Sequence, residues 1–195
     1  RNLWVSGRER GVAQANYYSL EALENYSYEE YHAPLEYTEK YFLYGITRDS
    51  FLAYYDHALY VGFFTTDADS VIEKFAISSD GGLVETLDRE WGLNMRVPVA
   101  EDISMISGKA QGIAFRDDQL LISQSYGIFP SQLRIFDHLS ASSLRDPHAT
   151  WSFSFPCQME QIYVDGNALY LLFESASYSY RAYVPTVIDR VIKIS

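Results

Sequence analysis

The chain has 195 residues, enough for one domain with a substantial core or for several small repeat units that share one. Its 15 basic and 26 acidic residues give a formal net charge of −11, and the basic residues are scattered, so the chain would repel phosphate backbones and anionic lipid surfaces. Hydrophobic residues make up 48% of the sequence, but no run approaches the roughly 20 apolar residues of a transmembrane helix. We therefore expect a globular chain that neither binds nucleic acid nor inserts into a membrane.

The first strand-like stretches are LWVS, residues 3–6, and AQANYYSL, residues 13–20. We expect them to be the second and third strands of an incomplete sheet over residues 1–45 whose innermost strand is missing. Ser19 is a candidate N-cap for a short helix that ends before Pro34. The tyrosines that alternate with glutamates in residues 19–44 fit either a sugar-stacking surface or, more commonly, half-buried strand positions.

Three later segments repeat one pattern, in which two apolar strands flank a polar turn. They are SFLAYYDHALYVGFF (50–64), QGIAFRDDQLLISQS (111–125) and EQIYVDGNALYLLFES (160–175). The step from Leu52 to Leu59 recurs from Ile113 to Leu120 and from Ile162 to Leu169, which a chance resemblance would not preserve. Each segment therefore predicts a β-hairpin in the same register.

Further strands are expected after each hairpin, from alternating apolar and polar residues. Third strands are predicted over residues 71–78, 131–137 and 189–195, and fourth strands over residues 93–99 and 149–155. The pattern predicts four-stranded antiparallel units over residues 50–99 and 111–155, and a unit over residues 160–195 that lacks its outer strand.

This repeat of four-stranded units resembles the β-propeller architecture, in which sheets called blades stack around an axis. A β-sandwich would explain the short strands but not the regular hairpin register. We expect an all-β fold that forms the C-terminal part, about three and a half blades, of a larger propeller; the alternative is a complete four-bladed propeller. Because unpaired sheet edges promote association, the expected partner is the remaining part as a second polypeptide, or a copy of the chain itself.

In a propeller, the innermost strands converge on an axial channel where ligands bind. Two residues before Leu52, Ile113 and Ile162 stand Ser50, Gln111 and Glu160, respectively. We expect these three residues at the same height around the channel mouth. Glu160 is the one carboxylate among them. It is a candidate catalytic acid or base, and an equally common role for such a glutamate is to accept hydrogen bonds from backbone N–H groups.

A second candidate cluster lies where the hairpins of 111–125 and 160–175 end. It consists of Gln124, Ser125, Tyr126, Glu174, Ser175, Tyr178 and Arg181. If Glu174 pairs with Arg181, the cluster is a structural clamp, which we favour. If both point into the channel, they would recognise a polar ligand.

Metal ligands are sparse in the sequence, and no cofactor is expected. The four histidines occur singly. Asp67 and Asp69 could bind calcium weakly, but their sequence fits a solvated turn better. The single cysteine, Cys157, is expected to be a small packed side chain.

Two functions remain open. The first is a binding module, extracellular or on the cell surface, that recognises a glycan or protein on its loop face; a cytoplasmic location stays open. The second is a hydrolase or lyase that uses Glu160 in the channel, with or without a divalent metal.

Overall fold

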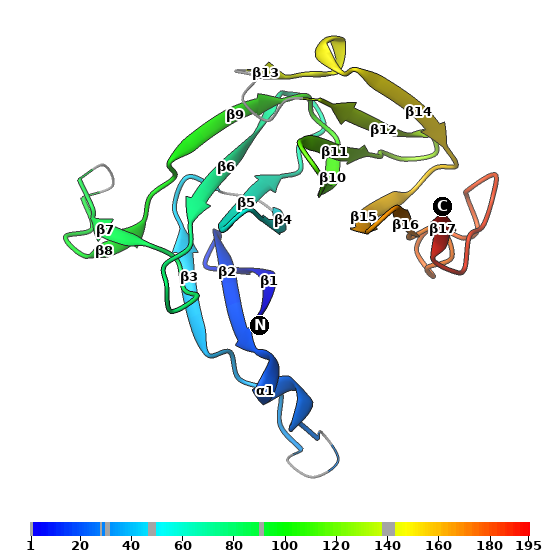
Figure 1. Cartoon of the computed structure of the whole chain (residues 1–195). Coiled ribbons are helices and arrows are strands. Elements are labelled where there is room, and N and C mark those ends of the chain that lie inside the picture. The colour runs from blue at the N-terminus through cyan, green and yellow to red at the C-terminus, as the bar shows by residue number, and fades with distance from the viewer. Residues whose placement is uncertain (1, 28, 30–31, 47–49, 90–91, 138–142) are drawn as a thin grey trace. The chain divides into compact units, whose positions relative to one another are not determined.

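The computed structural model describes residues 2–27, 29, 32–46, 50–89, 92–137 and 143–195. Figure 1 shows the chain as a succession of separate β-sheets with little helix. The all-β class predicted from the sequence is confirmed, whereas the propeller arrangement stays a prediction. None of the sheets closes on itself in the described part of the chain. No helix among those residues is long and apolar enough to cross a membrane.

The first sheet has three antiparallel strands in chain order, where the sequence predicted two. They are β1 (Asn2–Glu9), β2 (Val12–Ser19) and β3 (Glu39–Leu43). The predicted short helix is α1 (Leu20–Glu24), in which the Ser19 side chain accepts a hydrogen bond from the Ala22 N–H as an N-cap. Strand β1 packs against β4 of the next sheet.

The second sheet has five strands in the order β13-β9-β6-β5-β4. Their bounds are β4 (Ser50–Tyr55), β5 (Ala58–Phe63), β6 (Ser70–Ala76), β9 (Asp102–Ile106) and β13 (Ser143–Leu144). Strand β13 pairs with β9 in parallel. The hairpin β4–β5 and strand β6 follow the predicted order.

The predicted fourth strand at residues 93–99 is wrong. That segment contains β8 (Arg96–Pro98), which pairs with β7 (Glu85–Leu87) in a separate two-stranded sheet. The sequence predicted neither β7 nor β9, which takes the expected place beside β6. Alternation of apolar and polar residues marks a strand but does not say which neighbour it pairs with.

The third sheet agrees with the unit predicted over residues 111–155. Its four strands, β10 (Ala110–Arg116), β11 (Gln119–Gln124), β12 (Ser131–Phe136) and β14 (Trp151–Phe155), lie antiparallel in chain order. A short 3₁₀ turn, η1 (Asp146–His148), precedes β14. The fourth sheet has three strands, β15 (Met159–Asp165), β16 (Ala168–Phe173) and β17 (Ile192–Ile194), as expected for a unit without its outer strand.

The chain divides into two compact units. One comprises residues 1–61 and 73–102, and the other comprises residues 62–72 and 103–195. In the second unit, sheet β10-β11-β12-β14 packs face to face on sheet β15-β16-β17. Seven buried residues form this core: Ala114, Leu121, Leu133, Met159, Ile162, Leu171 and Phe173. Burying the leucine, isoleucine, methionine and phenylalanine side chains of this core stabilises by roughly 1.5–3 kcal/mol each, so this layer holds the unit together.

The hairpins β10–β11 and β15–β16 share backbone details as well as sequence. Gln111 and Glu160, 49 residues apart, are each skipped by the pairing register, so both are the extra residue of a β-bulge. Two residues earlier, Lys109 (φ 67°) and Gln158 (φ 66°) both adopt the left-handed conformation. The two hairpins therefore share one backbone design, offset by 49 residues.

Candidate functional site

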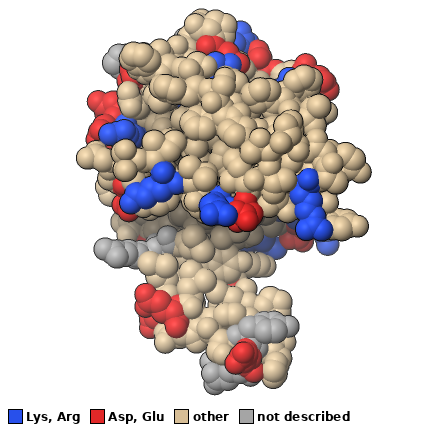
Figure 2. All heavy atoms as spheres, turned by 90° about the vertical axis from the view of Figure 1, so that its right-hand side faces the viewer, with Lys and Arg blue, Asp and Glu red and all other residues tan. Residues whose placement is uncertain are grey.

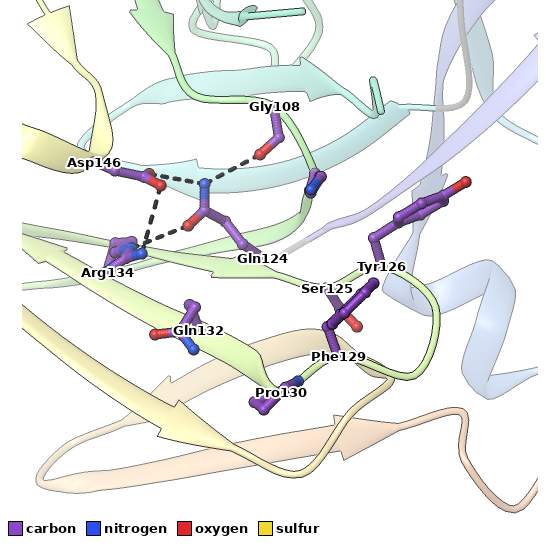
Figure 3. A pocket seen from close by; sticks show the side chains of 10 residues that line it. Gly108, Gln124, Ser125, Tyr126, Phe129, Pro130, Gln132, Arg134 and Asp146 are labelled. Carbon is purple, nitrogen blue, oxygen red and sulfur yellow. Dashed lines mark hydrogen bonds and ion pairs between the residues drawn. The ribbon is translucent and has the colours of Figure 1, made fainter. Parts of the chain in front are cut away.

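A pocket of about 230 Å³ opens in the second unit where β11 and β12 meet the loops around them. Its lining is drawn in Figure 3: Gly108, Lys109, Gln124, Ser125, Tyr126, Phe129, Pro130, Gln132, Arg134 and Asp146. Three predicted site residues, Gln124, Ser125 and Tyr126, belong to it. Most of the others lie in turns, which have no periodic pattern, or on β12, which was predicted as a strand without any of its residues being named as site candidates.

The floor of the pocket is a hydrogen-bonded polar network. The Gln124 Nε2 donates to Asp146 Oδ1 at 2.9 Å and to the Gly108 carbonyl at 3.1 Å, while its Oε1 accepts from Arg134 Nε at 3.1 Å. The Arg134 Nη2 lies 3.5 Å from Asp146 Oδ2, which closes a triangle of three side chains (Figure 3). Gln124 is buried, so it holds the other two in place, and Arg134 and Asp146 keep partial exposure toward solvent.

Aromatic side chains form the rim. Tyr126 and Phe129 are 48% and 68% exposed, and both belong to the turn that joins β11 to β12. The Lys109 ammonium lies 5.7 Å from the centre of the Tyr126 ring, and the centre of the Phe64 ring lies 6.3 Å from that of Tyr126. Tyr126 is thereby held while part of its surface stays open.

Two buried hydroxyl groups fix the base of this turn. Ser131 Oγ donates to Ser125 Oγ at 3.2 Å, and the same oxygens accept the backbone N–H groups of Met159 and Gln158, each at 3.0 Å. These N–H groups lie where the chain enters β15, so without the serines they would be buried and unpaired. The serines thus tie the pocket turn to the following sheet.

An open hollow of about 510 Å³ adjoins the pocket and shares Gly108, Lys109 and Asp146 with it. The calcium candidates Asp67 and Asp69 line the hollow. Asp69 pairs with Arg145 at 2.7 Å, and Asp67 accepts a hydrogen bond from the Thr66 hydroxyl at 2.7 Å. Among the described residues, no group of three His, Cys, Asp or Glu side chains lies close enough together to hold a metal ion.

Glu160 lies outside the pocket, at the bulge of β15. Burial raises the pKa of its carboxyl to about 7, and the charge of the nearby Glu174 adds to the rise. Burial, together with the charges of Glu174 and Glu160, also raises the pKa of Tyr180. Two predicted site residues, Glu160 and Glu174, are therefore close enough to interact, and near neutral pH Glu160 can give up or accept a proton.

The other predicted site residues fall elsewhere. Gln111 donates from Nε2 to the Ser125 carbonyl at 3.3 Å, which links its bulge to the pocket turn. Arg181 makes no ion pair with Glu174 in the described part of the chain; its guanidinium lies 5.8 Å from the ring centre of Tyr178, and both are exposed. The predicted Glu174–Arg181 clamp is thus replaced by a cation–π contact. Ser50 begins β4, and its side chain lies outside the described residues.

Cys157 is buried and free, as expected of a small packed side chain.

Neither a scan against protein-family models nor a search of curated proteins finds a match to this chain.

Proposed function

We propose that the chain is a binding module that recognises a glycan in the pocket rimmed by Tyr126 and Phe129. The observation that carries this proposal is the combination of exposed aromatic faces at the rim with a fixed network of planar polar side chains on the floor (Figure 3). Aromatic rings pack on the apolar faces of sugar rings, and preorganised carboxylate and guanidinium groups bind hydroxyls.

On the floor of the pocket the charges of Arg134 and Asp146 offset each other, which supports a hydroxyl-rich ligand, while Lys109 adds a positive charge to the lining. Arg134 and Asp146 compensate each other, so the pair offers donors and acceptors without a net charge. Figure 2 shows one face of the molecule on which acidic and basic side chains are interspersed, with no continuous patch of either sign. The pocket is also small, since drug-sized ligand sites span about 300–1,000 Å³, which suits one or two sugar rings.

The propeller assignment belongs to the same proposal. It is supported by two successive sheets that share a hairpin register, a bulge and a left-handed residue, and that pack face to face. On this reading the chain is the C-terminal part of a larger propeller, extracellular or on the cell surface, with the pocket on its loop face.

The test is a glycan array followed by isothermal titration with the glycans that bind. Tyr126→Ala and Phe129→Ala should each weaken binding about tenfold or more, because a stacking contact contributes about 0.5–1.5 kcal/mol beyond the area it buries. Tyr54→Ala is the matched control, since Tyr54 is an exposed tyrosine that does not line the pocket. Equal losses in all three variants, or binding to protein ligands alone, would overturn the glycan assignment.

A second candidate function rests on Glu160. Its raised pKa and its neighbour Glu174 suit a general acid or base of a hydrolase or lyase, with or without a divalent metal. Turnover of chromogenic glycosides that Glu160→Gln abolishes, without loss of binding, would support it. A rise in the melting temperature on addition of calcium would indicate that a metal ion takes part. If the wild type hydrolyses or cleaves none of the glycans that it binds, the enzyme function is overturned.

A further inference from the structure

The pocket rimmed by Tyr126 and Phe129 has a charge opposite in sign to that of the chain. Its lining carries two cations, Lys109 and Arg134, and one carboxylate, Asp146. The whole chain, by contrast, has 15 basic and 26 acidic residues. At physiological ionic strength, charges more than about 8 Å apart are largely screened, so the nearest groups decide what the pocket attracts. The lining therefore favours an anionic group on the ligand, although the chain as a whole is acidic.

Arg134 is already committed to the floor of the pocket. Its Nε donates to Gln124 Oε1 at 3.1 Å, and its Nη1 donates to Ser152 Oγ. Its Nη2 lies 3.5 Å from Asp146 Oδ2, so the carboxylate of Asp146 also offsets its charge. Within the lining, the positive charge that no carboxylate offsets is therefore that of Lys109.

Lys109 presents its ammonium at the rim without a carboxylate partner. Lys40 pairs with Glu9, but no ion pair in the described part of the chain includes Lys109. The Lys109 ammonium lies 5.7 Å from the centre of the exposed Tyr126 ring. A sugar that packs on Tyr126 thus has this ammonium within reach, and a lysine on its flexible stem binds a carboxylate as a point charge.

The internal repeat separates what the fold requires at this position from what it does not. Lys109 and Gln158, 49 residues apart, have φ angles of 67° and 66°. The Lys109 carbonyl accepts the Ser125 N–H at 2.9 Å, and the Gln158 carbonyl accepts the Glu174 N–H at 2.8 Å. The hairpin thus needs a left-handed residue and its carbonyl here, and glutamine meets both needs as lysine does. The fold alone gives no reason for a positive charge at residue 109.

The hollow beside the pocket indicates on which side of Lys109 an anion would lie. Lys109 borders the hollow as well as the pocket, and the hollow is also lined by Asp67 and Asp69. Arg145 lies 2.7 Å from Asp69 and offsets its charge, but no ion pair of the described residues includes Asp67. A carboxylate on the hollow side would face a like charge, so the pocket side, beside Tyr126, is favoured.

We propose that the ligand is an acidic glycan, in which the carboxylate of a uronic acid binds the Lys109 ammonium while the sugar ring packs on Tyr126. The carboxylate contact rests on the proposed function, because it requires a glycan in the pocket. It names the class of glycan and makes Lys109 the residue that determines specificity. The corresponding neutral sugar has a hydroxymethyl group in place of the carboxylate, and this group cannot offset the charge of the ammonium.

The test compares uronic-acid oligosaccharides that bind on the glycan array with their carboxyl-reduced forms, in which each carboxylate has become a hydroxymethyl group. Isothermal titration of the whole chain should give an affinity about three to ten times higher for the acidic form, as expected of a partly exposed charged contact. This ratio of affinities should fall as sodium chloride is added, because salt screens exposed charges.

Variants at residue 109 identify the group that reads the charge. Lys109→Gln should lower the ratio of affinities to about one, whereas Lys109→Arg should keep most of the preference. Lys193→Gln is the matched control and should leave the ratio unchanged. It removes the same charge, and the Lys193 ammonium also lies near a tyrosine ring, 5.5 Å from the centre of Tyr170, but Lys193 lines neither the pocket nor the hollow.

Circular dichroism checks that each variant folds. Glutamine already adopts the required backbone conformation at residue 158, so Lys109→Gln should fold. If it does not, Lys109→Asn replaces it, because asparagine tolerates a left-handed backbone.

The outcomes distinguish this proposal from the one on which it rests. If no glycan binds, acidic or neutral, the proposed function is overturned and the carboxylate contact with it. If the reduced forms bind as tightly as the acidic forms, or if only neutral or sulfated glycans bind, the pocket remains a glycan site but the uronic acid is overturned. A preference that survives Lys109→Gln, or that Lys193→Gln reduces equally, would overturn the role of Lys109.

Discussion

Glu160 shows how one residue can combine a structural position with a chemical property. It is the extra residue of the β15 bulge, and the pairing of its neighbours leaves it partly buried near a second carboxylate. Folding therefore favours its protonated form. Between its ordinary pKa of 4.5 and its folded value of about 7, the native state binds more protons than the unfolded chain.

Glu160→Gln should make the protein more stable above neutral pH. The wild type loses stability as the pH rises from about 4.5 to about 7, because the native state must give up a proton that burial favours. At pH 8 the free energy of unfolding of the variant should exceed that of the wild type by about 1 kcal/mol, a value reduced for the partial exposure of the side chain. Near pH 4 the two proteins should be equally stable. Urea denaturation across this range measures the difference, with the exposed Glu36→Gln as control. A gap that widens toward acid pH would contradict the prediction.

The residues of the site were only partly predictable from the sequence. The regular hairpin register identified Gln111 and Glu160, because a repeat marks equivalent positions without any knowledge of contacts, and Gln124 was identified as a polar residue at the end of an apolar strand. Arg134 and Asp146 were not identified, since β12 and η1 meet only after the sheet has paired. Phe129 lies in a turn, and the sequence of a turn shows no helical or strand periodicity from which its position could be predicted.

At the scale of the elements, the hairpins and the outer strands of the 111–155 unit were predictable, but the fourth strand beside β6 was not. Two apolar strands around a short polar turn are local in sequence, so β10–β11 and β15–β16 follow from pattern alone. Strand β8 has the expected alternation, yet it pairs with β7, because register and partner depend on contacts that lie far apart in the chain. The junction between sheets depends on two hydroxyls, of which Ser125 was in a candidate cluster and Ser131 was not.

Ser131→Ala should destabilise the second unit by about 1–3 kcal/mol, because it leaves the buried Met159 N–H without an acceptor. Ser125→Ala should have a similar cost, and the double variant should lose less than the sum, since the two hydroxyls hydrogen-bond to each other. Ser154→Ala, an exposed serine on β14, should change stability by less than about 0.5 kcal/mol. Denaturant unfolding measures all four chains, and strictly additive losses would contradict the coupling.

At the scale of the whole molecule, the net charge of −11 works against the folded state. Salt should therefore stabilise the chain. Raising sodium chloride from about 20 to 200 mM shortens the distance over which charges interact to below about 10 Å, so the melting temperature should rise by a few degrees. The exposed ion pairs, such as Lys74–Glu101, are too weak to reverse this trend. A calorimetric scan measures the shift, an uncharged osmolyte at matched osmolarity is the control, and a fall in melting temperature with salt would contradict it.

Strand β13 has a consequence for how ligand binding can be observed. It covers the edge of β9 with the residues Ser143 and Leu144, and Asp146 of the pocket follows two residues later, where its own N–H donates to Ser107 Oγ at 2.9 Å. A molecule that restrains Asp146 would also slow the opening of this short parallel strand. Amide hydrogen exchange at Ile106 and Leu144 would then report that the pocket is occupied, with no label placed inside it.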